Sequence, residues 1–254
     1  MPPSLPLIIG HRGASSEAPE NTLASFRLAF QEGADGIEAD FQLTRDGEIV
    51  CLHDAGTGRT AGIDLPVAGS TLAELRRLDV GLWKGERWRG ARIPALREVL
   101  GALPDGKRLF VELKGGPELV EPVAREVALH TVDPSRLRFL CFDAEVIRLI
   151  KKKLPHCRAC WLTDYRFRGY WRPSPAEVLA TLAGISADGL ASRDRAVLDE
   201  ALVGTLRSRG MEVHVWTVDS PAAARRLCGL GVDSIMTNRP GRLRASLEGK
   251  GGRP

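Results

Sequence analysis

Long hydrophobic runs are absent from this chain of 254 residues. A helix that crosses a bilayer needs about 18–20 apolar residues in succession, and no stretch of the sequence approaches that length. Residues 1–6 carry no basic side chain, and the apolar run Leu7-Ile8-Ile9 is too short for the core of a signal peptide. These absences argue against a spanning helix, and we expect a cytoplasmic protein with no stable membrane insertion.

Cysteine is scarce and unevenly placed, with five residues at Cys51, Cys141, Cys157, Cys160 and Cys228. An odd and scattered set argues against a framework of disulfides. The pair Cys157-x-x-Cys160 has the spacing of a metal or redox motif, but the chain holds no second pair of this kind. Because Trp161 and Leu162 continue an apolar run, we interpret the pair as part of a buried strand.

Blocks of like charge and low-complexity tracts are also missing. The net charge is +4 and the pI about 8.9, with lysine and arginine spread along the chain. Such a surface favours anionic substrates but has no basic stripe, so we expect no nucleic-acid partner. The composition, 43% hydrophobic and 27% charged, is that of a globular protein. The length suits a single α/β barrel of about 250 residues, and the oligomeric state is left open.

Short apolar runs alternate with segments of helical periodicity, which indicates repeated βα units and a parallel sheet. Nine runs are strand candidates: Leu7–Gly10, Gly36–Leu43, Glu48–His53, Arg108–Leu113, Leu137–Phe142, Arg158–Leu162, Asp188–Ala191, Glu212–Val218 and Ser234–Thr237. Helical patterns lie between most of them, at Thr22–Gln31, Leu72–Leu78, Ala95–Leu103, Glu118–Leu129, Glu145–Lys153, Pro175–Ala183, Ala196–Arg209 and Ala222–Leu230.

One short connection reduces nine candidate strands to eight. Only residues 44–47, Thr-Arg-Asp-Gly, separate the second run from the third. A parallel crossover needs a dozen or more residues, whereas Asp-Gly favours a tight hairpin. The third run should therefore fold back antiparallel on the second, outside a TIM (β/α)8 barrel. The hairpin returns His53 to the level of Glu38 and Asp40.

The predicted domain organisation follows from this barrel. A single catalytic barrel domain should occupy residues 1–248, with a small insertion over about 55–94 where the pattern is irregular and Trp83 and Trp88 occur. Residues 249–254 are rich in glycine and should form a disordered tail.

Acidic residues gather where the barrel strands are expected to end, which is where barrels of this type carry their active sites. Glu38 and Asp40 close the second run and, being two apart, point to one face of the strand. Glu112 ends the next barrel run, and Lys114 shares its face. Alone, these would be solvated or salt-bridged pairs. Together, three carboxylates suit Mg²⁺ or Ca²⁺, with Mn²⁺ as a further candidate, better than zinc.

Histidines and an arginine flank these carboxylates. His11 and Arg12 close the first run, and His53 ends the third and is followed by Asp54. Each histidine alone would pass for a strand cap or a turn residue. Two at one rim suit general acid–base catalysis, while Arg12 suits a phosphate oxygen. Asp54 is either a partner that orients His53 or a turn residue.

The order and spacing of these motifs over nearly the whole chain resemble the glycerophosphodiester phosphodiesterase family. The resemblance lies in His11-Arg12-Gly13, Pro19-Glu20-Asn21-Thr22, Gly33–Asp40, Thr44–Gly47, His53-Asp54, Val111–Lys114, Val215–Val218 and Gly231–Pro240. It implies a TIM barrel that hydrolyses glycerophosphodiesters to glycerol 3-phosphate and an alcohol on one divalent cation. The chain departs from the family pattern at Cys141-Phe142 and at Thr237-Asn238. Neither departure touches the metal residues, and both bear on the fine positioning of the substrate.

The resemblance also implies roles for individual residues. The metal ligands fall on Glu38, Asp40 and Glu112, and the acid–base histidines on His11 and His53. Arg12 and Lys114 correspond to phosphate-binding residues, and Trp216 to an aromatic wall of the pocket. A small-molecule glycerophosphodiester is then the expected partner.

Two other functions compete with this one. Hydrolysis of lysophospholipids in the manner of a lysophospholipase D would need an apolar channel, for which residues around Trp83, Trp88 and Trp171 are candidates. A non-catalytic barrel that binds phosphoesters would be expected to lack part of the metal or histidine set, which is complete here. The segment 165–173, rich in tyrosine and arginine, is either a cover for the substrate or a surface loop packed on a helix.

Overall fold

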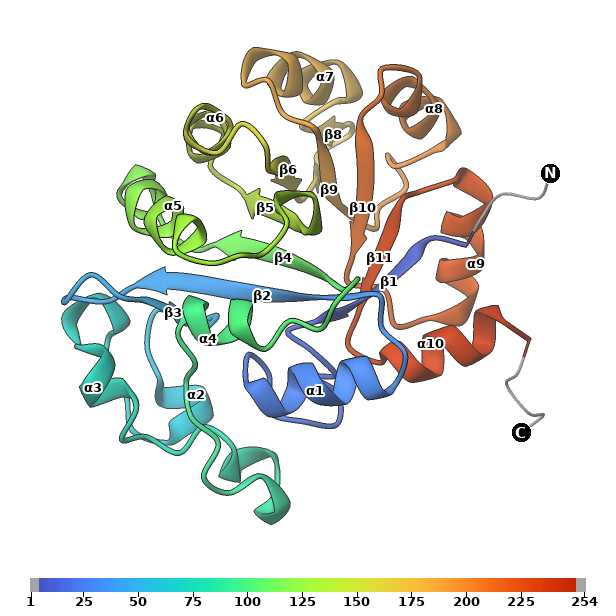
Figure 1. The fold of residues 1–254 in the computed structure, drawn as a ribbon. Helices are drawn as coiled ribbons and strands as arrows, with labels where there is room; N and C mark the ends of the chain where they lie inside the picture. The colour runs from blue at the N-terminus through green and yellow to red at the C-terminus, as the bar shows by residue number, and fades with distance from the viewer. Residues whose placement is uncertain (1–4, 250–254) are drawn as a thin grey trace.

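The computed structural model describes residues 5–249, and within them eight parallel strands close into a barrel (Figure 1). The strands are β1 (Leu7–His11), β2 (Gly36–Leu43), β4 (Arg108–Leu113), β5 (Leu137–Cys141), β6 (Arg158–Thr163), β9 (Gly189–Arg193), β10 (Glu212–Trp216) and β11 (Ser234–Thr237). Each pairs with the next in this order, and β1 pairs in parallel with both β2 and β11. The predicted TIM barrel is confirmed.

The helices form a ring around the strands in Figure 1. They are α1 (Leu23–Gln31), α4 (Leu96–Gly101), α5 (Val120–Ala128), α6 (Ala144–Lys153), α7 (Pro175–Gly184), α8 (Glu200–Ser208), α9 (Pro221–Leu230) and α10 (Pro240–Leu247). Phe26 of α1 and Ile147 of α6 are buried in the layer between helices and strands. Because the strands are covered on both faces, they consist of nearly continuous apolar residues, as the sequence shows.

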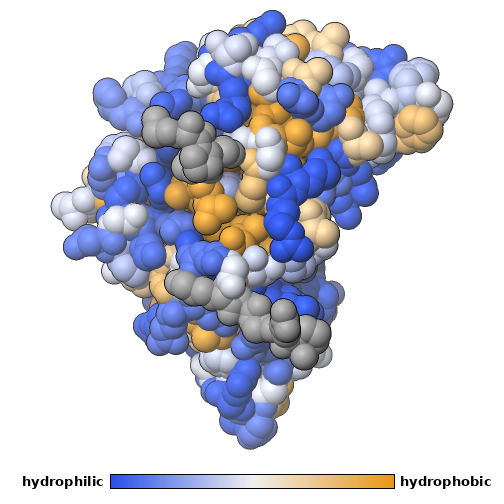
Figure 2. Space-filling view, turned by 90° about the vertical axis from the view of Figure 1, so that its right-hand side faces the viewer, coloured by the Kyte–Doolittle hydropathy of each residue, from blue (hydrophilic) through white to orange (hydrophobic). Residues whose placement is uncertain are grey.

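The outward faces of the ring are polar. Hydrophilic side chains cover most of the face in Figure 2, the side on which α9 and α10 lie in Figure 1, and hydrophobic residues gather near its centre. No helix within residues 5–249 is long and apolar enough to cross a membrane.

The predicted hairpin is also confirmed. Strand β3 (Ile49–Cys51) runs antiparallel to β2, with Phe41 opposite Cys51. The backbone N–H of Leu52 donates to the carbonyl of Asp40 at 3.0 Å, so the chain returns to the level expected. One detail was wrong: Glu38 and Asp40 do not close β2, because the strand continues for three further residues that pair with β3.

Residues 55–94 fold as short helical turns beside the hairpin: α2 (Gly58–Ala61), η1 (Val67–Gly69), α3 (Leu72–Leu75), η2 (Leu82–Lys84) and η3 (Glu86–Trp88). They share a small apolar cluster with β3, which includes Val50, Leu75 and Ile93. Lys84 Nζ donates to the carbonyl of Ser15 at 2.7 Å, and this bond fixes the segment against the loop that follows β1.

Some boundaries differ from the prediction for local reasons. Helix α8 begins at Glu200 and not at Ala196, because the Asp199 carboxylate accepts the backbone N–H of Leu202 and caps the helix there. The segment 165–173 contains a two-stranded hairpin, β7 (Arg166–Phe167) and β8 (Trp171–Arg172). The predicted disordered tail, apart from Gly249, lies outside the described residues.

A polar network fills the barrel interior around the N-terminal part of β10. Glu212 accepts hydrogen bonds from Arg138 at 2.9 and 3.1 Å and lies 3.1 Å from His214 Nε2. His214 Nδ1 in turn contacts Ser234 Oγ at 2.9 Å. The Cys160 thiol lies within 4.8 Å of Glu212 and His214, a spacing that could hold a metal ion. Because Arg138 already neutralises the carboxylate, we interpret the group as an internal salt bridge.

Glu212→Gln should destabilise the fold by about 3 kcal/mol at pH 7, because it leaves Arg138 and His214 without their anion. Burial opposes ionisation of Glu212, but hydrogen bonds from His214 and Arg138 outweigh it and lower its pKa to about 2, against an ordinary 4.5. The stabilisation should therefore be complete above about pH 4.5 and disappear as the pH falls toward 2. Urea unfolding at several pH values measures it. The matched control is Glu145→Gln, which removes an exposed ion pair with Arg148 and should leave the free energy of unfolding nearly unchanged. Equal losses in both variants would contradict the prediction.

Candidate active site

A tight left-handed turn after β1 aims the first residues of the site. Arg12 has φ 55° and Gly13 has φ 83°, and a side chain at Gly13 would clash with Ser25. The turn lets the Arg12 backbone N–H donate to Glu38 Oε2 at 3.0 Å. The Arg12 side chain then extends over β2, with Nε 3.1 Å from Asp40 Oδ2.

Three carboxylates from two neighbouring strands converge beside this turn. Glu38 and Asp40 lie on β2, and Glu112 lies directly opposite Asp40 on β4. Oxygen atoms of the three lie within 4.8 Å of one another, and all three side chains are buried. The parallel register of β2 and β4 thus joins residues that are far apart in sequence, as the sequence predicts.

Burial and mutual repulsion shape the ionisation of this group. Burial, with the Asp40 charge beside them, raises the pKa of both Glu38 and Glu112 to about 8. Burial alone would also raise the pKa of Asp40, but the Lys114 and Arg12 cations outweigh it and hold that pKa below its usual value. Lys114 Nζ is 3.1 Å from Asp40 Oδ1 and also bonds Glu112. The positive charges of Arg12 and Lys114 are therefore not enough to keep all three carboxyl groups ionised.

The donor set fits a divalent cation. Glu38 Oε1 and Asp40 Oδ1 are buried and accept no hydrogen bond, although the second forms an ion pair with Lys114. Buried carboxylate oxygens without a donor are unfavourable unless a cation approaches them. Oxygen ligands from three carboxylates are those that Mg²⁺, Ca²⁺ and Mn²⁺ accept. The residues predicted as metal ligands are thus brought together with unused ligand atoms.

His11 is held by residues from the far end of the chain. Asn238 Nδ2 donates to Asp219 Oδ2 at 2.8 Å, so its Oδ1 faces His11 Nδ1, also at 2.8 Å. An acceptor at Nδ1 requires the proton there and leaves Nε2 with a free lone pair. That Nε2 atom is 3.9 Å from Glu38 Oε2. Burial and the nearby Arg12 charge lower the pKa of His11, which favours the neutral ring.

His53 stands on the other side of the carboxylates, at the end of the hairpin arm. Its Nδ1 atom is 2.7 Å from Asp54 Oδ1. Of the two roles expected for Asp54, a partner that orients His53 or a turn residue, this contact favours the first. A hydrogen bond from Arg59 lowers the pKa of Asp54 to about 2, which keeps this carboxylate ionised. The histidine thus has an anion behind it, whereas His11 has a neutral amide.

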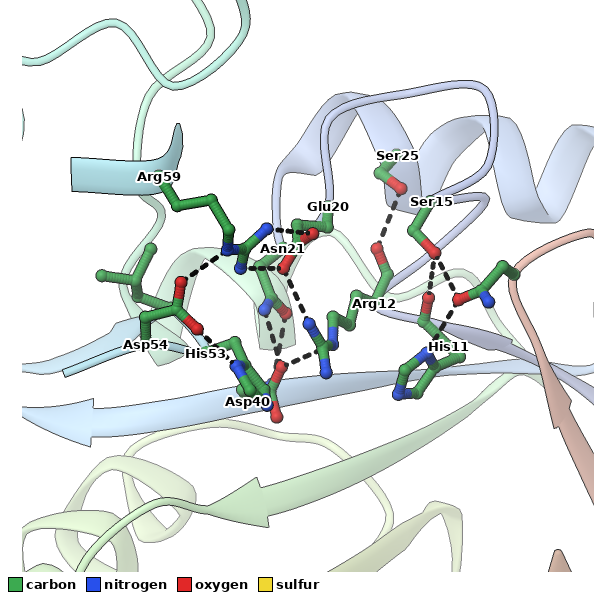
Figure 3. Close-up of polar contacts among 12 residues, drawn as sticks. His11, Arg12, Ser15, Glu20, Asn21, Ser25, Asp40, His53, Asp54 and Arg59 are labelled. Carbon is green, nitrogen blue, oxygen red and sulfur yellow. Dashed lines mark hydrogen bonds and ion pairs between the residues drawn. The ribbon is translucent and has the colours of Figure 1, made fainter. Parts of the chain in front are cut away.

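Figure 3 shows a chain of alternating charges that connects the two sides. Arg59 bonds Asp54 at 2.5 Å and both oxygens of Glu20 at 2.8 Å, and Glu20 also accepts from Arg12 at 2.8 Å. Asn21 donates to Asp40 Oδ2 at 2.8 Å. Glu20 and Asn21 belong to the motif Pro19-Glu20-Asn21-Thr22, but the sequence assigns them no role in the site. The sequence shows only that these two polar residues stand just before the Thr22 helix cap. Polar residues are common at that position for other reasons, so the pattern does not indicate a site residue.

The Trp216 side chain packs against the apolar cluster in the barrel interior. It ends β10, across the barrel from β4, and its ring packs edge-on against Phe142 with 5.7 Å between centroids. The Arg193 guanidinium lies 5.7 Å from the centre of the same ring. A hollow of about 370 Å³ opens beside His11. It is lined by His11, Arg12, Ser15, Ser16, Glu20, Asp219, Asn238 and Arg239.

Comparison with known proteins identifies the family. The model of the glycerophosphoryl diester phosphodiesterase family matches residues 11–242, which is nearly the whole chain. The chain belongs to this family. It is therefore a phosphodiester hydrolase of the glycerophosphodiester phosphodiesterase type, and the enzyme class predicted from the sequence is confirmed.

Relatives of this family cover the full length of the chain. A glycerophosphodiester phosphodiesterase of Caldanaerobacter subterraneus is 33% identical and matches 97% of this chain and 99% of its own. A probable glycerophosphodiester phosphodiesterase 1 of Mycobacterium tuberculosis is 32% identical, matching 96% of this chain and 93% of its own. A phosphodiesterase of Oleispira antarctica, solved with the product sn-glycerol-3-phosphate, is 28% identical with a TM-score of 0.86, covering 96% of this chain and 97% of its own.

The glycerophosphodiester phosphodiesterase assignment makes the His11–Asn238 contact testable. Asn238→Ala removes the acceptor that fixes the His11 ring, so kcat should fall roughly 10- to 100-fold while KM changes little. Steady-state kinetics on glycerophosphocholine measure both constants. Ser15→Ala is the matched control, because Ser15 bonds the same Asn238 oxygen without touching the ring, and it should have a much smaller effect. Unchanged kcat in the Asn238 variant would refute the positioning role.

Proposed function

We propose that the protein hydrolyses glycerophosphodiesters to glycerol 3-phosphate and an alcohol, with one divalent cation at Glu38, Asp40 and Glu112. The observation that carries the proposal is the convergence of these three buried carboxylates between His11 and His53. A relative of the same fold, the Oleispira antarctica phosphodiesterase, holds sn-glycerol-3-phosphate, and this supports the proposed product.

The cation, when bound, supplies Lewis-acid stabilisation of the negative charge that develops on the phosphoryl group. Arg12 lies over the same carboxylates and carries a fixed charge that can bind a phosphate oxygen. Lys114, on the neighbouring strand, adds a second cation on the side of Glu112. Both side chains are already held by ion pairs, so the site needs little reorganisation when an anion arrives.

The two histidines differ in a way that suggests separate roles. His11 Nε2 has a free lone pair and a ring kept neutral by burial, so it serves as the base that accepts the proton of the attacking hydroxyl. That hydroxyl belongs to water or to the neighbouring carbon of the substrate. His53 is hydrogen-bonded at Nδ1 to the Asp54 carboxylate, which fixes the direction of the ring, so we assign it as the acid that protonates the leaving alkoxide.

A panel of glycerophosphodiesters tests the proposal after chelation of bound metals. Glycerol 3-phosphate should form only when Mg²⁺, Ca²⁺ or Mn²⁺ is restored, and the panel would show which cation and which alcohol the enzyme prefers. Turnover that persists in chelator would disprove the cation requirement. Failure to turn over any substrate with any cation would favour the non-catalytic barrel. The identity of the cation and the cytoplasmic location stay predictions from the sequence.

Exposed aromatic rings near the mouth favour a second candidate substrate. Phe142, which contacts Trp216, is 48% exposed, and Phe167 of β7 is 62% exposed. Such surfaces suit an acyl chain, so lysophospholipids are the alternative substrate for the same chemistry. The ratio of kcat/KM for glycerophosphocholine and for long-chain lysophosphatidylcholine separates the two.

A further inference from the structure

Large apolar side chains that are exposed gather on a few segments of the described chain. They are Leu5, Ile63, Leu82, Trp83, Leu129, Phe142, Phe167 and Tyr170. Three come from the insertion, one from the loop after β5, and two from the hairpin after β6, whereas only Leu5 and Leu129 lie elsewhere. Loops that follow barrel strands surround the catalytic end. Exposed apolar groups concentrated at one end of a protein mark an interaction surface.

The β7–β8 hairpin carries the most exposed of these rings. Its strands pair Phe167 with Trp171, and the Trp171 ring packs against both Phe167, at 5.1 Å, and buried Tyr165, at 6.5 Å. Trp171 and Tyr165 therefore hold the base of the hairpin. Phe167 and Tyr170 are 62% and 59% exposed, so much of the surface of each ring faces solvent.

The same hairpin is strongly cationic. Residues 166–172 contain three arginines and no acidic residue. Arg172 pairs with Glu177, but within residues 5–249 neither Arg166 nor Arg168 has a carboxylate partner. Exposed aromatic rings beside unpaired arginines are the combination that binds an anionic lipid surface, because the rings enter the headgroup region and the guanidinium groups bind lipid phosphates.

Contacts at the base of the hairpin place it beside the catalytic mouth. Asp164, which precedes Tyr165 and β7, accepts a hydrogen bond from Arg193 at 2.9 Å. Arg193 lies over the ring of Trp216, and Trp216 contacts Phe142. The hairpin, Arg193, Trp216 and Phe142 therefore form one continuous surface along the rim.

We propose that the β7–β8 hairpin and Phe142 dock the catalytic mouth on an anionic lipid bilayer. The docking is interfacial, since no helix within residues 5–249 can cross a membrane. A free phosphate ion would need the arginines alone, so the outward rings point to a lipid surface. This inference concerns location at a membrane and does not depend on the proposed hydrolysis.

Sedimentation with vesicles tests the proposal directly. The full-length protein should bind phosphatidylcholine vesicles that contain about 30% phosphatidylglycerol, bind pure phosphatidylcholine much more weakly, and dissociate as salt is added. The double variants F167S/Y170S and R166Q/R168Q should each weaken binding to the anionic vesicles by about tenfold. Circular dichroism should show unchanged melting of both variants, because the substituted side chains are exposed.

Two matched controls make the result specific. Leu129→Ser removes an apolar side chain that is 74% exposed at the end of α5. R209Q/R225Q removes two exposed arginines, one just after α8 and one on α9. Neither should change vesicle binding. Absence of binding by the unmodified protein, equal losses in the controls, or loss in the arginine variant alone would each overturn the proposal. Turnover of soluble glycerophosphocholine should be the same in R166Q/R168Q and in both controls as in the unmodified protein, so failure of docking is distinguishable from failure of the proposed hydrolysis.

Discussion

Replacement of either His11 or His53 by alanine should lower kcat for glycerophosphocholine by about 10³-fold, because we propose that each ring moves a proton that no neighbouring group can carry. Arg12 and Lys114 cannot act as bases near neutral pH, and the carboxylates between the histidines are the proposed cation ligands. Initial rates at saturating substrate and cation provide the measurement. KM should change much less than kcat, since Arg12 and Lys114 are the proposed contacts of the phosphate.

A third histidine controls for the general effect of the substitution. His156 is exposed at the end of the loop before β6, and His156→Ala should retain full activity and stability. Circular dichroism and thermal melting should show that the His11 and His53 variants remain folded. If either catalytic variant kept activity within about tenfold of the unmodified enzyme, the assignment of the acid–base pair would be wrong.

Glu112→Gln should weaken binding of Mg²⁺ or Mn²⁺ by at least about 100-fold and abolish turnover at ordinary cation concentrations. The substitution keeps the size of the side chain but removes one of three anionic ligands. Isothermal titration measures the affinity, and Glu118→Gln, an exposed carboxylate just after the same strand, is the control that should leave it unchanged. Unaltered affinity in the Glu112 variant would exclude this residue from the cation site.

The pH dependence of cation binding follows from the same carboxylates. With pKa values of about 8, Glu38 and Glu112 retain protons near neutral pH in the cation-free protein, and a cation must displace them. Affinity should therefore rise as the pH increases from about 6 to 8.

The same pKa gives a stability test that separates ligand from structural roles. The pKa of Glu112 is higher in the folded protein than its ordinary 4.5, so above about pH 4.5 its ionisation favours the unfolded chain. Glutamine removes that penalty and should not lower the melting temperature of the cation-free enzyme.

The barrel could be predicted from the sequence because the length of one short loop indicates the hairpin that departs from regular βα alternation. Only four residues separate the second and third predicted strands, which leaves room only for a hairpin. The hairpin reduces nine predicted strands to eight and brings His53 back toward Asp40. The meeting of Glu112 with Asp40 followed from the order of parallel strands, since neighbouring strands in a barrel align their ends. These inferences needed only loop length, strand period and the rule for barrel active sites.

Other parts of the site depend on closure of the whole barrel and had no local signal. His11 and Asn238 are 227 residues apart and meet only because β11 pairs with β1. Helix α10 begins at Pro240, followed by Gly241. In the sequence, a Pro-Gly pair is typical of a turn, so it does not indicate the start of a helix. Arg59 lies in the irregular insertion, where neither strand nor helix period indicates which way a side chain points.

The position of Arg59 couples the insertion to both catalytic arms. Its guanidinium holds Asp54, the partner of His53, and Glu20, the partner of Arg12. A movement of α2 would thus loosen the contacts of the proposed proton-transferring residue His53 and of the proposed phosphate-binding residue Arg12 together. An effector that bound the insertion and displaced this one side chain would act on both halves of the reaction at once, without entering the substrate hollow.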